Sequence, residues 1–386
     1  MNELKNIITI NDFNYSQGGA SKVAIDTANM LADAGYTSVF ISAVSDDNKS
    51  TLNKNVIQYK FKGIEFLHYD NKIKGMIDGI RCKKFSDFVA NILTNFSVEN
   101  TVIHVHGWTK ACSSDFFNIL KMKGFKVYLT LHEYFSFCPN GAYFNFKKNH
   151  ACSKKGCSLN CLLCNCDSRN YIFKIYRFVR EFKYKKDIDF KYINAIYISD
   201  FEKKIVQSQI DVPYSTVICN PVSKISSNRL EKEYDYVYIG RTSKEKGVDL
   251  FVNLAKQLKD KKFLIVGDYI SSIENLKITG WVSELEVDEY LKKSSILVFP
   301  SLWPETFGLN VIKALALGIP CIVSSNTAAE HYVCNGKNGY VFKQGDFLSL
   351  SKVAKECIDI NRVTRLETPD YLAKLILLWK GALNEN

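Results

Sequence analysis

Short runs of β-branched and aromatic residues alternate along the chain with longer stretches whose apolar residues recur every three or four positions. In the first half these runs are Ile7–Ile10, Ser38–Ala43, Val102–Val105, Val127–Leu131 and Ala195–Ile198. Between the first two, apolar positions from Val23 to Ala34 share one face of a helix that Gly35 ends. Such alternation predicts a parallel sheet with crossover helices.

The second half of the chain repeats this pattern. Its expected strands are Tyr236–Ile239, Phe263–Val266, Ile278–Trp281, Ile296–Phe299 and Cys321–Ser324, and its clearest expected helices are Val248–Lys259 and Phe307–Leu317. Two successive α/β halves predict two doubly wound, Rossmann-like domains. We place the join near Val212–Ser227, because prolines and serines interrupt the periodicity there.

Composition and charge narrow the class of protein. The 386 residues are 46% hydrophobic and 24% charged, which excludes a disordered or fibrous protein. No apolar stretch reaches ~18 residues and the start resembles a strand rather than a signal peptide, so we expect a cytoplasmic protein without a membrane span. The excess of 51 basic over 40 acidic residues, +11, favours nucleic acid, phosphorylated metabolites or an anionic membrane face as partners.

Two turns between a strand and a helix are candidate phosphate sites. Gly18 and Gly19 open the first helix, where free N–H groups favour an anion, although a tight turn would have the same glycines. Arg241 and Lys246 lie on the turn 240–247 at the carboxyl end of a strand, the edge where such sheets bind ligands. The alternative for that turn is a solvated basic loop.

A proline-bracketed loop and three histidines are the other candidates. Glu305 precedes a helix whose first N–H groups, from Phe307 to Asn310, would hold a phosphate while the carboxylate holds sugar hydroxyls. It would equally serve as a helix cap. His104, His106 and His132 lie at the carboxyl ends of neighbouring expected strands, which favours a cleft there.

Two segments depart from the α/β pattern. Six of the twelve cysteines lie within 29 positions and would hold structural zinc, remain reduced thiols or form disulfides: Cys138, Cys152, Cys157, Cys161, Cys164 and Cys166. The following segment, 169–191, has eight basic and three acidic residues on an amphipathic pattern. It would lie on an anionic membrane, bind a pyrophosphate group, or cover the domain with its apolar side inward.

Together these motifs resemble glycosyltransferase family 4, retaining transferases with the GT-B fold. The most specific part is 299–342, with Pro-Ser-Leu-Trp-Pro-Glu-Thr-Phe-Gly-Leu-Asn, Glu330 and Asn338-Gly339-Tyr340-Val341 in the family's order. Gly-Arg-Thr-Ser-Lys-Glu-Lys-Gly from Gly240 is the second hallmark. The cysteine-rich segment is similar to an insert of family members that build bacterial surface polysaccharides.

The resemblance implies roles for individual residues. Arg241 and Lys246 match the cations that bind the donor diphosphate, Glu305 the acid that contacts the donor sugar, and His132 the histidine near the reacting centre. The nucleotide-sugar site would also include Gly18, Gly19, Trp281, Phe307, Gly308, Leu309 and Lys313.

One position departs from the family pattern. The second acid of its Glu-x7-Glu motif, which holds the ribose hydroxyls, falls on Lys313. A lysine donates hydrogen bonds and accepts none. Our hypothesis is that Lys313 still faces the nucleotide and either donates to a ribose oxygen or pairs with an acid such as Glu330.

The sequence and the resemblance therefore predict an α/β protein of the GT-B class. An acceptor-side domain spans 1–212 with a Cys-rich insert at 138–166, a nucleotide-sugar domain spans 213–370, and a tail helix at 371–386 returns to the first domain. The expected activity is that of a retaining hexosyltransferase, using a UDP- or GDP-sugar without a resident cofactor or metal. It would act on a lipid-linked saccharide in O-antigen, capsule or exopolysaccharide synthesis, at the inner face of the cell membrane.

Two alternatives stay open at this point. One is another GT-B enzyme, a nucleotide-sugar epimerase, against which the Glu305 loop argues. The other is a zinc-containing nucleic-acid-binding protein, which would explain the charge and the cysteines but leaves the two α/β halves unexplained and lacks a recognition motif.

Overall fold

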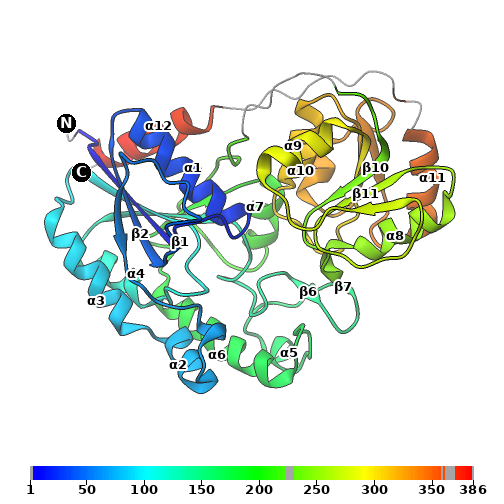
Figure 1. Ribbon diagram of the computed structural model, residues 1–386. Helices are drawn as coiled ribbons and strands as arrows, with labels where there is room; N and C mark the ends of the chain where they lie inside the picture. The colour runs from blue at the N-terminus through cyan, green and yellow to red at the C-terminus, as the bar shows by residue number, and fades with distance from the viewer. Residues whose placement is uncertain (1–2, 223–229, 358–359, 361–369, 385–386) are drawn as a thin grey trace.

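Two α/β domains lie side by side in the computed structural model, which describes residues 3–222, 230–357, 360 and 370–384 (Figure 1). The N-terminal domain has a seven-stranded parallel sheet in the order β3-β2-β1-β4-β5-β8-β9. Its strands are β1 (Asn6–Phe13), β2 (Thr37–Val44), β3 (Ile57–Lys60), β4 (Thr101–Val105), β5 (Lys126–Leu131), β8 (Asn194–Tyr197) and β9 (Ser215–Val217). This sheet runs on to Val217, beyond the boundary expected at residue 212.

The C-terminal domain has a six-stranded parallel sheet in the order β12-β11-β10-β13-β14-β15. Its strands are β10 (Tyr234–Ile239), β11 (Phe263–Val266), β12 (Leu276–Ile278), β13 (Ser294–Phe299), β14 (Cys321–Ser324) and β15 (Gly339–Phe342). Because β12 ends at Ile278, the strand expected over Ile278–Trp281 is wrong and Trp281 lies in a loop. Part of the expected join at Val212–Ser227 falls on 223–227, outside the described residues.

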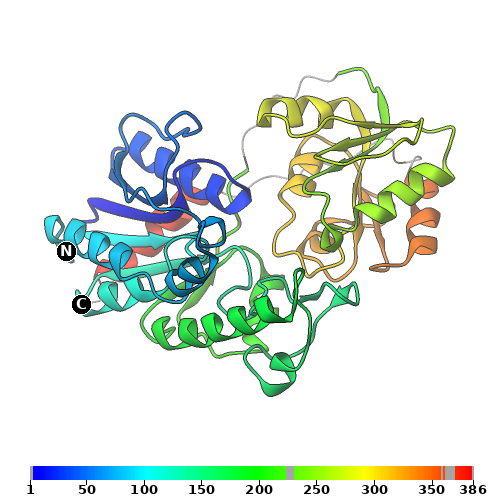
Figure 2. The same ribbon diagram turned by 60° about the horizontal axis from the view of Figure 1, so that its bottom comes forward.

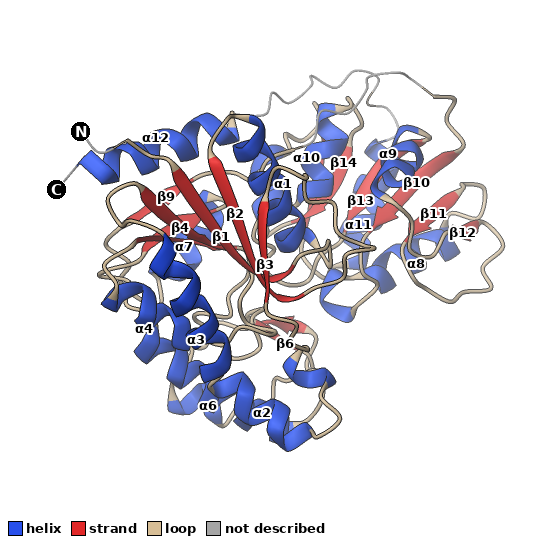
Figure 3. Cartoon of the chain, turned by 60° about the vertical axis from the view of Figure 1, so that its left-hand side comes forward, coloured by secondary structure: helices blue, strands red, loops and turns tan. Residues whose placement is uncertain are grey.

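Helices cover both faces of each sheet (Figure 3). In the N-terminal domain they are α1 (Gly19–Asp33), α2 (Lys72–Ile80), α3 (Lys83–Ile92), α4 (Asp115–Met122), α5 (Leu159–Leu162), α6 (Tyr171–Asp187), α7 (Asp200–Gln207) and the short η1 (Phe66–His68) and η2 (Leu93–Asn95). In the C-terminal domain they are α8 (Val248–Gln257), α9 (Glu284–Lys292), α10 (Leu309–Ala316), α11 (Phe347–Cys357), η3 (Lys244–Lys246) and η4 (Ala328–Tyr332).

The last helix, α12 (Tyr371–Asn384), returns to the N-terminal domain and lies beside α1 (Figure 1). Leu375 and Trp379 are fully buried there among residues of the first sheet, including Tyr128 of β5. The Tyr371 hydroxyl lies 2.9 Å from the Thr27 hydroxyl of α1. Residues from the end of the chain therefore complete the core of the domain that begins it.

The Cys-rich segment forms a small lobe below the first sheet, with α5 and α6 (Figure 2). It holds the antiparallel pair β6 (Phe144–Asn145) and β7 (His150–Ala151) and the helical turn α5. Every cysteine is a free thiol, and the described residues contain no cluster of three or more His, Cys, Asp or Glu arranged to hold a metal ion. The lysine ammonium of Lys174, fully buried, donates to the sulfurs of Cys161 at 3.1 Å and Cys166 at 3.4 Å.

Helix α6 does not divide its residues as the amphipathic pattern suggests. The cations Lys174 and Arg180 are buried, whereas Ile172, Val179 and Phe182 are exposed. The expectation that the apolar residues of this segment share one face is wrong, because Tyr176 and Tyr184 are buried on the opposite side of the helix. Within the described part of the chain, no helix has both the length and the apolar character needed to cross a bilayer.

Candidate functional site

The best-defined polar cluster lies where the order of the second sheet reverses. The chain runs outward from β10 through β11 to β12 on one side, and from β13 through β14 on the other. The loops that follow β10 and β13 therefore lie at the carboxyl edge of the sheet, at the point where sheets of this kind bind ligands. Arg241 and Lys246 follow β10, and Glu305 follows β13.

A short ion pair joins these two loops. The ammonium of Lys246 lies 2.6 Å from Glu305 Oε2 and 4.8 Å from the centre of the Trp303 ring. The same carboxylate oxygen accepts a hydrogen bond from Trp303 Nε1 at 2.8 Å. Both charged side chains are largely buried, so their geometry is held by the loops rather than by solvent. Trp303 is a site residue that the sequence reasoning missed, although it lies inside the quoted motif.

Glycine at 247 allows the two loops to approach this closely. Gly247 has φ +70°, and a Cβ there would stand 1.9 Å from the carbonyl oxygen of Pro300. Beside this contact, the Leu302 N–H donates to the Glu245 carbonyl at 2.8 Å. The turn that bears Lys246 is therefore fixed against the backbone of the Glu305 loop.

Arg241 stands at the same edge with its guanidinium exposed. Its backbone carbonyl accepts a hydrogen bond from the Tyr238 hydroxyl at 2.5 Å, which ties the turn to β10. Among the described residues no acid pairs with this guanidinium. It is therefore a cation available to an anion at this edge of the sheet, whereas Lys246 is already held by Glu305.

The start of α10 adds backbone donors beside Glu305. Gly308 adopts φ +85° and begins the helix, while the Phe307 side chain is buried against Ile198 and Ile312. The N–H groups of Leu309 and Asn310 lie in the first turn, where a helix offers them no acceptor. The Asn310 side chain donates to the carbonyl of Ile239 at 3.1 Å, so this first turn is held against the end of β10.

Lys313 is buried and paired with two acids of α9. Its side chain is only 4% exposed, and its ammonium lies 2.7 Å from Glu284 Oε1 and 3.1 Å from Asp288 Oδ1. The hypothesis that Glu330 is the partner is wrong, since the Glu330 carboxylate accepts from the backbone N–H of Asn326 instead. Two carboxylates thus lie beside the position where the family pattern expects one. Neither was found from the sequence, because the spacing of Glu284 and Asp288 is that of any solvated helix face.

Glu284 also links the two domains. Its other carboxylate oxygen lies 2.8 Å from the ammonium of Lys22, on α1 of the N-terminal domain. Lys22 follows the turn of Gly18 and Gly19, where a Cβ at either glycine would meet nothing within 4 Å. The glycine turn therefore faces open space, one helical turn from an ion pair that reaches the other domain.

Three histidines form a hydrogen-bonded chain at the edge of the first sheet. His104 Nε2 lies 2.7 Å from the Thr130 hydroxyl, His104 Nδ1 lies 3.2 Å from His106 Nε2, and His106 Nδ1 lies 2.9 Å from His132 Nε2. Burial lowers the pKa of His104 and of His132 to about 3 and that of His106 well below its usual value. The three rings are therefore neutral at pH 7, and each has one N–H donor and one nitrogen that accepts a hydrogen bond.

This histidine chain ends at the Glu305 loop. The Thr306 hydroxyl donates to the carbonyl of His132 at 3.0 Å, and the Tyr134 hydroxyl donates to the carbonyl of Pro304 at 2.9 Å. The structure thus brings His132, Glu305 and Lys246 into one region between the domains. Trp281 is placed differently: its side chain is 70% exposed on the loop before α9. Its role in binding the nucleotide stays a prediction.

Sequence comparison identifies a known domain in the second half. Residues 221–368 match the family described as glycosyl transferases group 1. A 41.2 kDa protein encoded in the cps region of Klebsiella pneumoniae is 29% identical over 150 residues, 35% of this chain and 42% of that one. The capsular polysaccharide biosynthesis glycosyltransferase CapM of Staphylococcus aureus is 25% identical over 35% of this chain and 42% of its own length.

A third relative is named as a lipid-linked sugar transferase. The Escherichia coli UDP-Gal:alpha-D-GlcNAc-diphosphoundecaprenol alpha-1,3-galactosyltransferase is 25% identical over 40% of this chain and 44% of that enzyme. Each of these matches spans less than half of the relative's length.

Solved structures match over nearly the whole chain. Sucrose-phosphate synthase from Thermosynechococcus elongatus superposes with a TM-score of 0.66 at 15% identity, covering 98% of both chains. TarM of S. aureus gives 0.67 at 11% identity over 99% of this chain and 100% of its own. Anabaena HepE in complex with UDP and glucose gives 0.61 at 13% identity, over 92% and 89%. The fold is therefore GT-B, as the sequence predicted.

Proposed function

We propose that this chain, whose second half carries a group 1 glycosyl transferase domain, is a retaining hexosyltransferase that takes a sugar from a nucleotide diphosphate donor. The proposal rests on three features that lie together at one edge of the second sheet. They are the Lys246–Glu305 ion pair, the free guanidinium of Arg241 and the first turn of α10. That group of charges suits a sugar joined to a diphosphate. Its carboxylate can accept hydrogen bonds from sugar hydroxyls. Its cations and backbone N–H groups can bind phosphate oxygens.

The proposed chemistry separates charge across the anomeric carbon. When the bond from that carbon to the diphosphate oxygen breaks, positive charge develops on the sugar and negative charge on the leaving diphosphate. Arg241, Lys246 and the N–H groups of Leu309 and Asn310 would stabilise the leaving group where its charge forms. These groups supply the positive charge, so the proposed reaction needs no resident cofactor.

Retention follows from attack on the same face of the sugar. The acceptor hydroxyl forms the new bond to the anomeric carbon and gives its proton to the departing phosphate oxygen. Glu305 would hold the donor sugar through its hydroxyls, and His132, which is neutral, would orient the sugar or the acceptor by hydrogen bonding. No second carboxylate nucleophile is required. Because His132 of the first domain lies beside the Glu305 loop of the second, closure of the domains would exclude water from the activated donor.

We propose a lipid-linked saccharide as the acceptor and polysaccharide assembly, such as that of a capsule, as the process, at the inner face of the cell membrane. The names of the relatives in capsule synthesis and of the diphosphoundecaprenol-specific transferase support this. A uridine diphosphate sugar is the first candidate donor, supported by the latter name and by the UDP seen in HepE. Guanosine diphosphate sugars are the second.

A thermal-shift screen against UDP, GDP and their sugars tests the donor site, because a ligand that binds only the folded state raises the melting temperature. We expect one nucleotide class to raise it by several degrees. Arg241→Ala and Lys246→Ala should each remove that shift and lower turnover by about 10²–10³-fold, as the loss of one stabilising donor does elsewhere. Lys244→Ala, an exposed lysine of the same turn, is the matched control. Normal activity in both variants, or no response to any nucleotide, would contradict the proposal.

A further inference from the structure

Two adjacent helices of the N-terminal domain present apolar side chains to solvent. Ile73 of α2 is 72% exposed and Ile172 of α6 is 71% exposed. We call this surface the α2–α6 face, and its exposed apolar members are Ile73, Ile77, Ile172, Ile175, Val179 and Phe182. On α6 the four occur at steps of three and four residues and so line one side of the helix. Clustered exposed apolar residues of this kind mark an interaction site rather than ordinary surface.

The packing of α2 and α6 explains why these residues point outward. Gly79 of α2 lies so close to α6 that a Cβ there would stand 2.0 Å from the Tyr176 hydroxyl, and Gly75 lies equally close to the carbonyl of Phe66. The glycine side of α2 is therefore the buried side, and Ile73 and Ile77 project from the other. On α6 the inner positions are occupied by Lys174 and Arg180, which are bonded to cysteine sulfurs and to the Thr109 carbonyl.

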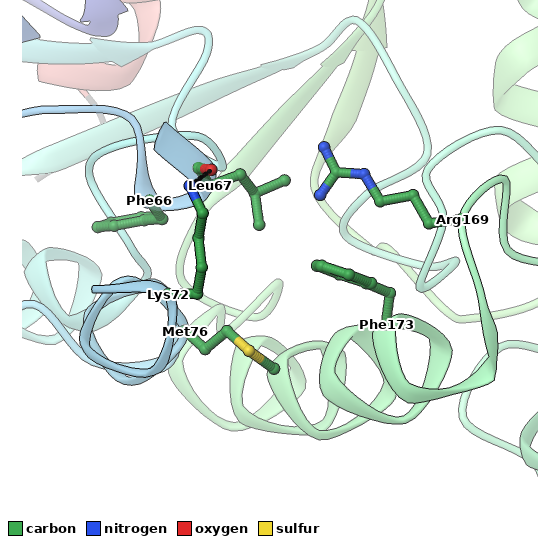
Figure 4. Close-up of a pocket in the computed structure, with 6 residues that line it drawn as sticks. All are labelled: Phe66, Leu67, Lys72, Met76, Arg169 and Phe173. Atoms are coloured by element: carbon green, nitrogen blue, oxygen red, sulfur yellow. Dashed lines mark hydrogen bonds between the residues drawn. The ribbon is translucent and has the colours of Figure 1, made fainter. Parts of the chain in front are cut away.

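Between the two helices lies a pocket of about 320 Å³ with mixed lining (Figure 4). Lys72 and Arg169 supply two cations, and the remaining lining is apolar: Phe66, Leu67, Met76 and Phe173. The Lys72 ammonium reaches the Leu67 carbonyl at 3.4 Å, and the Arg169 guanidinium lies 4.8 Å from the centre of the Phe173 ring. Within the described ranges neither cation is paired with an acid. The lining suits a molecule with an anionic group and a hydrocarbon part.

The pocket wall is bonded to the glycine turn of the candidate site. The Phe66 N–H donates to the Lys110 carbonyl at 2.9 Å, and Glu65, the preceding residue, accepts from the Gln17 amide at 2.6 Å. The Lys110 ammonium in turn donates to Oε1 of the Gln17 side chain at 3.1 Å. Gln17 immediately precedes Gly18, so the wall of the pocket is connected through hydrogen bonds to the glycine turn of the candidate site.

We propose that the α2–α6 face lies on an anionic lipid bilayer and that the pocket binds the phosphate of the lipid carrying the acceptor. This rests on the proposed function. Apolar side chains would enter the headgroup region while cations meet anionic lipid, as in interfacial helices. The exposed cations on and beside the face are Lys72, Lys74, Arg169 and Lys186, against two acids, Asp70 and Asp78. Charge complementarity thus favours a lipid surface over a second copy of this basic chain.

Co-sedimentation with vesicles of phosphatidylethanolamine and phosphatidylglycerol tests the face. Ile73→Ser/Ile77→Ser should weaken vesicle binding by about tenfold or more, because two apolar side chains no longer leave water. Ile270→Ser/Leu377→Ser is the matched control: it removes two aliphatic side chains elsewhere on the surface that are even more exposed. Equal binding by the wild type and the face variant, or equal loss in the control, would overturn the docking surface.

Adding a small fraction of a polyprenyl monophosphate to the vesicles tests the pocket. Its presence should increase binding by the wild type, and Lys72→Ala/Arg169→Ala should lose that increase, measured against the variant's own binding to the original vesicles. Lys74→Ala/Lys186→Ala, which also removes two cations, should keep the increase. The lipid-phosphate site is wrong if the pocket variant keeps the increase. It is also wrong if inorganic phosphate alone protects the wild type against thermal unfolding as well as the polyprenyl monophosphate does.

Donor binding separates this inference from the proposed function. The face and pocket variants should retain the nucleotide-induced thermal shift, because none of the changed residues belongs to the proposed donor site. Loss of vesicle binding with an intact nucleotide shift supports the docking surface by itself. If the protein binds vesicles normally but no nucleotide raises its melting temperature, the enzyme proposal is overturned and the proposed membrane surface is unaffected.

Discussion

At the scale of single residues, burial decides what the titratable groups of the site can do. Among the residues that the structure describes, the rings of the three histidines bond only to one another and to Thr130, and no acid is bonded to them that would favour their charged forms. They therefore act as hydrogen-bonding groups, and the tautomer of each is set by its neighbour. His104 and His106 would thus be positioning residues that fix which nitrogen of His132 carries its proton.

These lowered pKa values predict a pH-dependent stability. An unfolded chain binds protons on its histidines below about pH 6.5, whereas the folded chain holds the three rings neutral until far lower pH. The free energy of unfolding should therefore fall as the pH falls below about 6.5, by up to about 1.4 kcal/mol per pH unit for each ring. The window extends downward to about pH 3, the folded pKa of His104 and His132.

His132→Gln checks this, since glutamine keeps one donor and one acceptor for His106 but does not titrate. Urea unfolding at pH 7.5, 6.0 and 5.0 should show a shallower pH slope in the variant, by about one histidine. His150→Gln, at an exposed position, is the control. An unchanged slope in His132→Gln would mean that His132 is charged in the folded protein.

At the scale of elements, the site depends on how closely two loops can approach. The turn after β10 and the loop after β13 belong to neighbouring parallel strands, and their contact is made through backbone at Gly247 and Pro300. The position of the Lys246 ammonium beside Glu305 is a consequence of that contact. A side chain at 247 would push the turn away from the loop.

Gly247→Ala should therefore destabilise the chain and separate Lys246 from Glu305. We expect a loss of more than about 2 kcal/mol, since the left-handed backbone alone costs about 1–2 kcal/mol and the methyl group would also meet a carbonyl. Donor-dependent activity should fall about 10²-fold or more. Gly124→Ala is the matched control, because Gly124 has φ +79° and nothing within 4 Å of its Cβ position. It should lose stability and keep activity; equal activity in both variants would contradict the role given to this contact.

At the scale of the whole molecule, one chain of charges joins the two domains. Lys22 of the first domain pairs with Glu284, Glu284 with Lys313, and Lys313 with Asp288. The departure from the family pattern at Lys313 is thus compensated within the C-terminal domain, by two acids of α9. Lys313 and Asp288 are largely buried, and either of them left unpaired would lose its solvation without gaining a partner.

Lys313→Glu, the change that restores the family pattern, should accordingly harm this protein. It would place three carboxylates together with the side chain of residue 313 buried, and we expect a loss of about 3–5 kcal/mol of stability. Adding Asp288→Lys should recover most of that loss by reversing the pair. Thermal unfolding of the single and double variants measures both effects. Full stability of Lys313→Glu alone would show that the acids of α9 are not its partners in solution.

Much of this architecture could be predicted from the sequence, and the missed parts have physical reasons. Long β-branched runs identified the central strands, whereas β3 and β9 are short and only half-buried, so their sequences carry little apolar signal. The shared edge of Arg241, Lys246 and Glu305 followed from parallel topology alone. The Lys246–Glu305 bond did not, because loop conformation sets it.

Other features of the site differ in how much signal they leave. His104 and His106 are two positions apart on one strand and therefore share a face, so their contact was available from the sequence. The partners of Lys313 were not, because a buried lysine can pair with any acid that the fold brings near. The cations of α6 that point inward are contrary to the amphipathic pattern, which places charged residues on the exposed side. They can be buried because cysteine sulfurs and a backbone carbonyl accept hydrogen bonds from them.

The return of α12 to the first sheet affects how the protein is made. Trp379 fills a fully buried position beside Tyr128, and the contact between Thr27 and Tyr371 spans 344 positions of the chain. On the ribosome, nascent domains generally fold as they emerge. Here part of the first sheet stays uncovered until α12 has been translated, so the N-terminal domain cannot complete its core before the whole C-terminal domain has emerged.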